Sequence, residues 1–445
     1  MGLCCRSLAA TLLACLAPAF AQTAELPAVD VQHYTLEITP DLAAKTVTGV
    51  ETLRLRARQA GVIEVLLDSG ALVVDSAMLR GDSLAVDKLG ARSAIHLKQP
   101  LATGQPETLQ LRYHGTPKYG ITFLPEAPQV HTDFSTSQWM PCLDAPDARA
   151  TLDLTLVLPA GMQTAATGSL AAQQPRPGGL QASTWRLAQP MPSYLYGFAA
   201  GHFRELLVQP VASGQPQLRQ LAPMAVSEAQ MRQIFRDTPD MLAFFQAKSG
   251  VPYPFARYTE VLLQGYAGQE MAGMSVLGER HGQRVLADEK ALWLGAHELA
   301  HTWWGNGVTN RAWTHFWLNE GITTFMTAAY IEHRFGREEY MKQIDGARTK
   351  YEAILAAGQD KPLVFPNWDK PSASDRSLVY DKGAYVVHLL RQHVGEAAFW
   401  AGLQAYTRKH WGQTAVTADF QAAMEQAHGQ SLVPFFAKWV YLTAP

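Results

Sequence analysis

The sequence has few cysteines, little excess charge and no long apolar run beyond its N-terminus. Of the 445 residues, four are cysteines, and three of these stand within the first fifteen positions. Removal of that region leaves Cys142 alone, which excludes a fold stabilised by disulfides within the chain. The net charge of −2 excludes the basic surface that nucleic-acid binding requires. No apolar stretch of about 18 residues follows the N-terminus, which excludes a membrane-spanning helix in the mature chain.

Residues 1–21 have the pattern of an export signal. A short positive segment precedes a small apolar run, and Ala19-Phe20-Ala21 matches the A-x-A cleavage rule. A lipoprotein signal ending at Cys15 is a weaker alternative, because the apolar run before it is very short and Leu13 fits that pattern poorly. Either signal predicts an exported protein, periplasmic or secreted.

Apolar and polar residues alternate along the first half of the mature chain. Tyr34, Leu36 and Ile38 show the pattern, which recurs up to about residue 205 with Gly, Pro and Asp between the runs. A period of two is typical of strands that bury one face. We therefore expect an N-terminal β domain over residues 22–205, built as an antiparallel sandwich or saddle.

The spacing of the apolar residues changes to a helical period near residue 206. Ser227 opens a capping-box sequence, and a helical pattern over residues 317–335 stops near Gly336. We expect a mainly helical domain over residues 206–445. The predicted fold class is α+β, with two domains in the mature chain.

The segment His297–His301, with the sequence H-E-L-A-H, is the sharpest chemical signal. Positions i and i+4 of a helix share one face, which lets two imidazoles bind one zinc ion. Glu298 then lies beside the metal, where it can take a proton from metal-activated water. Glu320 follows after eighteen intervening residues, on the next helical run, and supplies a third ligand. A structural zinc needs four Cys or His ligands, so this set predicts a catalytic zinc.

The residues around this motif resemble the zinc aminopeptidases of the aminopeptidase N family, gluzincins with the pattern H-E-x-x-H-x18-E. The resemblance covers essentially the whole mature chain and rests on the segments His297–Asn306, Trp317–Gly321, Pro141–Pro146, Ser193–Leu195, Pro252–Phe255 and Tyr380–Gly383. It implies a thermolysin-like catalytic domain, one zinc ion and peptide substrates. Most members carry a further C-terminal domain, but only 65 residues follow Tyr380. The chain therefore looks like a two-domain short form.

The resemblance also implies two roles outside the zinc motif. The family's exopeptidase signature, G-x-M-E-N, matches a stretch that keeps Gly268 and Glu270 but has Gln269 and Met271 where Met and Asn are usual. Its glutamate pairs with the α-ammonium of the substrate, so Glu270, with Gly268 beside it, is the expected substrate-binding residue. Tyr380 is expected to donate its hydroxyl to the developing oxyanion.

Two other functions remain open at the level of sequence. A zinc endopeptidase would result if Glu270 bound no amine and the site admitted long chains. A zinc-containing protein that binds peptides without turnover would have no need of Glu298 and Tyr380. The sequence does not define the oligomeric state, the preferred N-terminal residue or the physiological substrate.

Overall fold

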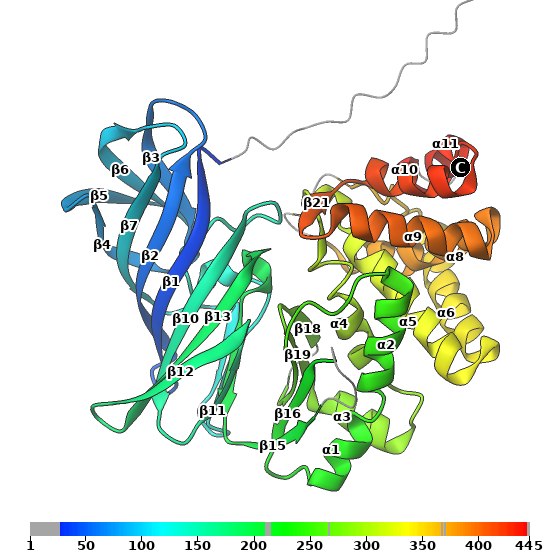
Figure 1. The fold of residues 1–445 in the computed structure, drawn as a ribbon, viewed down its shortest axis with the longest axis horizontal. Helices are drawn as coiled ribbons and strands as arrows, with labels where there is room; N and C mark the ends of the chain where they lie inside the picture. The colour runs from blue at the N-terminus through cyan, green and yellow to red at the C-terminus, as the bar shows by residue number, and fades with distance from the viewer. Residues whose placement is uncertain (1–26, 210–214, 266–267, 366–367, 369–370, 443–445) are drawn as a thin grey trace, which may run out of the picture.

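The computed structural model describes residues 27–209, 215–265, 268–365, 368 and 371–442 (Figure 1). The expected export signal, including Cys15, lies outside these residues. Cys142 is buried and is a free thiol among the residues that the structure describes. None of the helices in the described ranges combines the length and the apolar character that a bilayer crossing requires.

Fourteen strands form the first part of the described chain. Their bounds are β1 Val29–Asp41, β2 Thr46–Ala57, β3 Val62–Asp68, β4 Val73–Leu79, β5 Asp82–Leu89, β6 Arg92–Leu101, β7 Pro106–Gly115, β8 Ile121–Leu124, β9 Gln129–Thr132, β10 Arg149–Pro159, β11 Gln163–Ala166, β12 Ser169–Arg176, β13 Leu180–Pro192 and β14 Phe198–Gly201. Ten of them form one sheet in the order β12-β13-β10-β1-β2-β7-β4-β5-β6-β3, and the other four form the sheet β11-β14-β9-β8.

The alternating residues of β1 bury one face of the large sheet, with Leu36 and Ile38 fully buried. The strands of both sheets pair antiparallel, as expected, except for β1 and β10, which pair in parallel with His33 opposite Thr151. Parallel neighbours need a long connection, which here comprises β2 to β9. Sequence alternation has the same period of two in both pairings and so does not distinguish them.

A five-stranded sheet in the order β15-β16-β17-β19-β18 begins the second part. Its strands are β15 Phe203–Val208, β16 Gln217–Pro223, β17 Arg257–Leu263, β18 Gly268–Met271 and β19 Met274–Gly278. The expected boundary between residues 205 and 206 falls inside β15, and the pairing of β15 with β16 assigns the whole strand to this sheet. In Figure 1 the sheet lies between the large sheet and the helices.

Helices make up most of the second part. Their bounds are α1 Glu228–Ile234, α2 Thr238–Ser249, α3 Glu279–Ala287, α4 Trp293–Ala300, α5 Trp317–Phe335, α6 Arg337–Ala356, α7 Ala373–Ser377, α8 Gly383–Val394, α9 Glu396–His410, α10 Thr417–His428 and α11 Val433–Phe436. Two π-helical turns, η4 Leu378–Lys382 and η5 Ala437–Tyr441, precede α8 and follow α11; a short two-stranded sheet joins β20 Val308–Asn310 to β21 Gln413–Ala415. A β-rich domain followed by a helical domain confirms the predicted fold class.

Candidate metal centre

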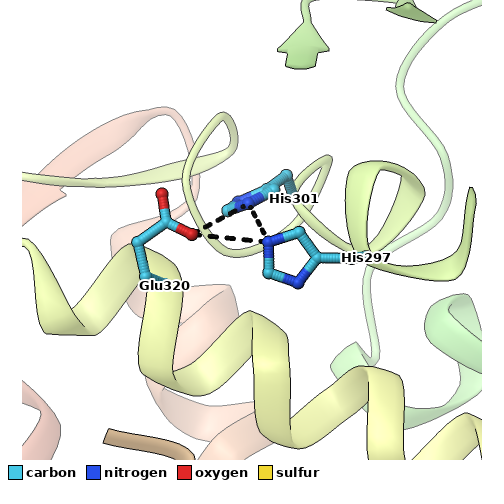
Figure 2. Close-up of side chains that lie close together, drawn as sticks. All are labelled: His297, His301 and Glu320. Atoms are coloured by element: carbon cyan, nitrogen blue, oxygen red, sulfur yellow. Dashed lines mark hydrogen bonds and ion pairs between the residues drawn. The ribbon is translucent and has the colours of Figure 1, made fainter. Parts of the chain in front are cut away.

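Helices α4 and α5 bring the three predicted metal ligands together (Figure 2). His297 and His301 stand one turn apart at the end of α4, and Glu320 lies in the first turn of α5. All three side chains are buried. The i, i+4 spacing therefore places both imidazoles on the face of α4 that packs against α5.

The ligand atoms form a small triangle. The Nε2 atoms of His297 and His301 lie 3.0 Å apart, and Oε2 of Glu320 lies 3.4 Å from each of them. Bonds of about 2.0–2.1 Å to a tetrahedral zinc place ligand atoms about 3.3 Å from one another. The triangle therefore has the size that a zinc ion requires, and three protein ligands leave a fourth position for water or substrate.

The electrostatic potential at the three ligand atoms favours a cation. Burial opposes protonation of His301, but the carboxylates of Glu320 and Glu270 outweigh that effect and raise its pKa to about 10. Burial lowers the pKa of His297 to about 4, which favours the neutral form of this imidazole. The donor set and this potential together fit a divalent metal.

The turn after α4 fixes the orientation of His301. Its Nδ1 donates to the carbonyl oxygen of Trp304 at 3.0 Å, which leaves Nε2 free to face the metal position. Gly305 has a positive φ of 131°, and a Cβ added there would lie 2.8 Å from that same Nδ1. Thr323 of α5 also donates to the Trp304 carbonyl, at 2.8 Å. The space left at Gly305 and the hydroxyl of Thr323 thus keep the imidazole of His301 in this orientation.

Glu298 is buried beside the ligands without belonging to the triangle. Burial raises the pKa of its carboxyl well above the ordinary value, and the neighbouring carboxylates of Glu270 and Glu320 raise it further. The backbone of Gly268 in β18 lies against this carboxyl group. A Cβ added at Gly268 would lie 2.5 Å from Oε1 of Glu298. Gly268 therefore gives Glu298 its space, a role that the sequence did not indicate.

Glu270 reaches the same place from the edge strand β18. Ligand atoms of Glu270, Glu298 and His301 all lie within 4.8 Å of one another. Oε1 of Glu270 is buried and has no hydrogen-bond partner among the residues that the structure describes. Burial raises the pKa of Glu270 to about 7. A buried carboxyl with one unpartnered oxygen next to a metal ligand indicates a binding site.

The two faces of β18 have different roles. Gly268 and Glu270 face Glu298 and the end of α4, whereas Gln269 and Met271 pack against the first part of the chain. A Cβ added at Gly197 would lie 2.5 Å from Sδ of Met271. The two departures from the family signature thus lie on the face that points away from the zinc ligands.

Gln269 joins β18 to the β domain. Its Oε1 accepts from the backbone N–H of Phe134 at 2.7 Å, and its Nε2 donates to the carbonyl oxygen of Tyr194 at 3.0 Å. The amide of this buried side chain is therefore hydrogen-bonded at both ends, across the boundary between the β domain and the five-stranded sheet.

Tyr194 brings the β domain up to the metal ligands. Its hydroxyl donates to the carbonyl oxygen of Gly305 at 2.8 Å and accepts from Nδ2 of Asn319 at 3.2 Å. Asn319 directly precedes the ligand Glu320, and its Oδ1 accepts from the backbone N–H of Asn310 at 3.0 Å. Sequence reasoning gave Tyr194 and Asn319 no role, although both lie in motifs that carry the family resemblance.

Tyr380 lies in the π-helical turn η4, the kind of irregular turn that is frequent at functional sites. Its ring stacks on His297 with centroids 5.8 Å apart, and its side chain interacts with Glu320. Burial, followed by the charges of Glu320 and Glu270, raises the pKa of the hydroxyl well above 10. Tyr380 is therefore a neutral phenol, able to donate its proton in a hydrogen bond beside the metal position.

Comparisons with known proteins place the two halves of the chain in one family. Residues 30–195 match the peptidase M1 N-terminal domain, and residues 235–439 match the peptidase family M1 domain. Aminopeptidase M1-D of Oryza sativa subsp. japonica is 25% identical over 92% of this chain and 49% of its own length. Leucine aminopeptidase 2 of Aspergillus terreus is 28% identical over 58% of this chain and 42% of its own. The chain spans less than half the length of these relatives.

Solved structures of similar length share the fold. An M1 zinc metallopeptidase from Deinococcus radiodurans superposes with a TM-score of 0.76 at 24% identity, over 94% of this chain and 96% of that one. A mutant two-domain M1 zinc metallopeptidase bound to L-arginine gives 0.78 at 25% identity, over 94% and 95%. These neighbours and the buried ligand set indicate zinc as the cofactor. The two matched domains cover most of the chain, which belongs to peptidase family M1.

Proposed function

We propose that this protein is a zinc aminopeptidase, which removes residues one at a time from the N-terminus of peptides. The observation that carries the proposal is the position of Glu270, a buried carboxyl with an unpartnered oxygen beside the ligand His301. Such a group favours a cation, and the α-ammonium of a peptide is a cation one residue away from the bond to be cleaved.

The short distance between Glu270 and the metal ligands favours an exopeptidase over an endopeptidase. His301 belongs both to the metal triangle and to the cluster with Glu270 and Glu298, whose ligand atoms lie within 4.8 Å of one another. An ammonium group held at Glu270 therefore brings the first peptide bond to the metal ligands. An internal peptide bond presents an uncharged amide there, which would leave the buried carboxyl unpaired.

The protein groups have separate roles in the proposed reaction. Zinc bound by His297, His301 and Glu320 would act as a Lewis acid that polarises the carbonyl group and acidifies water. Glu298 accepts the proton of the attacking water and passes it to the leaving amine, a role that its raised pKa supports. The hydroxyl of Tyr380 donates a hydrogen bond to the oxyanion.

The relatives support this assignment. Curated proteins similar to the chain are called aminopeptidases. One structural neighbour holds the substrate Tyr-Ser-Ala and others hold L-tryptophan or L-arginine, ligands that each carry a free α-amine. We further propose that the protein is exported, on the basis of the sequence of residues 1–21 alone.

Pairs of aminoacyl-amide substrates, free and N-acetylated, test the proposal. The wild-type enzyme should cleave the free forms, reject the acetylated forms and lose activity with a chelator. Glu270→Gln keeps the shape of the side chain and removes its charge, so the preference for free amines should fall about 10- to 100-fold.

Two results would contradict the proposal. Equal cleavage of free and acetylated substrates would instead indicate an endopeptidase. Stoichiometric zinc with no turnover of any substrate in the panel would indicate a peptide-binding protein.

A further inference from the structure

Helix α5 and the start of helix α8 touch at two glycines. A Cβ added to Gly321 would lie 2.9 Å from Cα of Gly383 and 3.1 Å from the carbonyl oxygen of Val379. A Cβ added to Gly383 would lie 2.8 Å from Cα of Gly321. Because the obstacles are backbone atoms, a larger residue on either side must push the two helices apart.

This contact lies between two residues of the candidate site. Gly321 directly follows the ligand Glu320 on α5, and Gly383 comes three residues after Tyr380, at the end of the π-helical turn. The carbonyl group of Val379 belongs to the peptide bond that joins Val379 to Tyr380, so α5 at Gly321 lies against the backbone that carries Tyr380 as well as against Gly383. The contact of Gly321 with this backbone therefore sets how near the Tyr380 side chain comes to Glu320 and His297.

The π-helical turn is also held by a buried ion pair. Nζ of Lys382 donates to Oδ1 of Asp360 at 2.7 Å and to the carbonyl oxygen of Lys361 at 2.8 Å. The two charged side chains are only 1% and 4% exposed, so neither charge is satisfied by solvent. The pair ties the turn to the segment after α6, while the glycine contact ties it to α5.

We propose that Gly383 is a positioning residue whose contact with Gly321 sets the place of the Tyr380 hydroxyl beside the metal ligands. The proposal rests on the proposed function, in which Tyr380 stabilises the oxyanion. Gly383 touches neither substrate nor metal in this scheme and acts only through Tyr380. A displacement of about 1 Å at a catalytic group can cost about 100-fold in rate, so this contact is a sensitive one.

The backbone at Gly383 makes alanine a clean probe. Its φ and ψ are −55° and −53°, ordinary helical values that any residue adopts, and Cα of Gly321 on α5 is the one atom closer than 3.4 Å to an added Cβ. Gly346 in α6 is the matched control, because it is exposed and an added Cβ there has no atom within 4 Å. Gly346→Ala should leave kcat and KM unchanged.

Gly383→Ala should lower kcat about 10- to 100-fold, with KM and zinc content changed less than about twofold. Tyr380→Phe should lower kcat about 100- to 1,000-fold, as the loss of an oxyanion donor does. In the double variant the glycine substitution should have no further effect, because the group that it positions is gone. Multiplicative losses in the double variant, or an unchanged kcat in Gly383→Ala, would overturn the proposal.

Two measurements keep the proposal testable in other circumstances. If Gly383→Ala does not fold, Asp360→Asn is the substitute, because it weakens the ion pair that holds the π-helical turn from its other side. Asp360→Asn should lower kcat in the wild type but not in the Tyr380→Phe variant. An equal loss of kcat in the Tyr380→Phe variant would contradict the proposal. If the wild type cleaves none of the substrates, the proposed function fails by itself. A crystal structure of Gly383→Ala then decides the positioning role, which a Tyr380 hydroxyl at its wild-type place would refute.

Discussion

The metal ligands and the groups around them are built in different ways. His297, His301 and Glu320 come from two consecutive helices, and the turn directly after α4 fixes the orientation of His301 through the Trp304 carbonyl. Glu270 and Tyr380 come from an edge strand and a π-helical turn distant in sequence. The metal triangle is therefore largely a local structure, whereas the substrate-directed groups depend on long-range packing.

The contacts of β18 show what this dependence means. Backbone bonds join Ala272, just after the strand, to Leu195 and Gly168, and the Gln269 amide adds two more hydrogen bonds across the same boundary. The β domain thus holds the strand that carries Glu270. Changes on α4 and α5 should affect metal binding or chemistry, and changes at the domain boundary should affect substrate binding.

The largest effect is expected at the metal triangle itself. Glu320→Ala removes one of the three ligands and leaves two imidazoles, so both zinc content and activity should be lost. Metal analysis of the purified variant, beside turnover of a free aminoacyl amide, checks the result. Full zinc occupancy in this variant would show that Glu320 is not a ligand.

A smaller loss, without loss of metal, is expected at the neighbouring position on α4. Glu298→Gln keeps the volume next to Gly268 but cannot accept a proton, so kcat should fall about 100- to 10,000-fold. Zinc content should stay that of the wild type, because Glu298 is outside the triangle. A variant that kept most of its turnover would contradict the assignment of Glu298 as the base.

This division also explains how much the sequence could predict. His297 and His301 could be placed from helical spacing alone, and Glu320 from its position on the next helical run after eighteen intervening residues. The predicted helix at residues 317–335 matches α5 for the same reason. Alternation in the N-terminal half predicted strands, but it did not predict the parallel pairing of β1 with β10.

The site residues that come from distant parts of the chain could be identified only through the family resemblance. Spacing says nothing about the approach of Gly268 to Glu298, because the two residues lie on different elements. The same holds for the link from Tyr194 to Asn319, which depends on how the β domain meets α5. Each of these contacts is set by tertiary packing that local patterns do not encode.

The smallest effect, and the most direct test of the domain boundary, is expected at Gln269. Gln269→Leu keeps a similar volume but leaves the Phe134 N–H and the Tyr194 carbonyl oxygen without their partner, a cost of about 1–3 kcal/mol per buried group. Because β18 also carries Glu270, KM for free-amine substrates should rise several-fold while zinc content stays constant.

Gln189→Leu is the matched control for this substitution. Gln189 of β13 also donates across the boundary, to the carbonyl oxygen of Pro254 at 3.1 Å, but it does not contact β18 through that bond. Its loss should lower thermal stability without a change in KM. Equal increases of KM in both variants would mean that the boundary acts as a whole, whereas an effect confined to Gln269 identifies β18 as the element through which the β domain controls substrate binding.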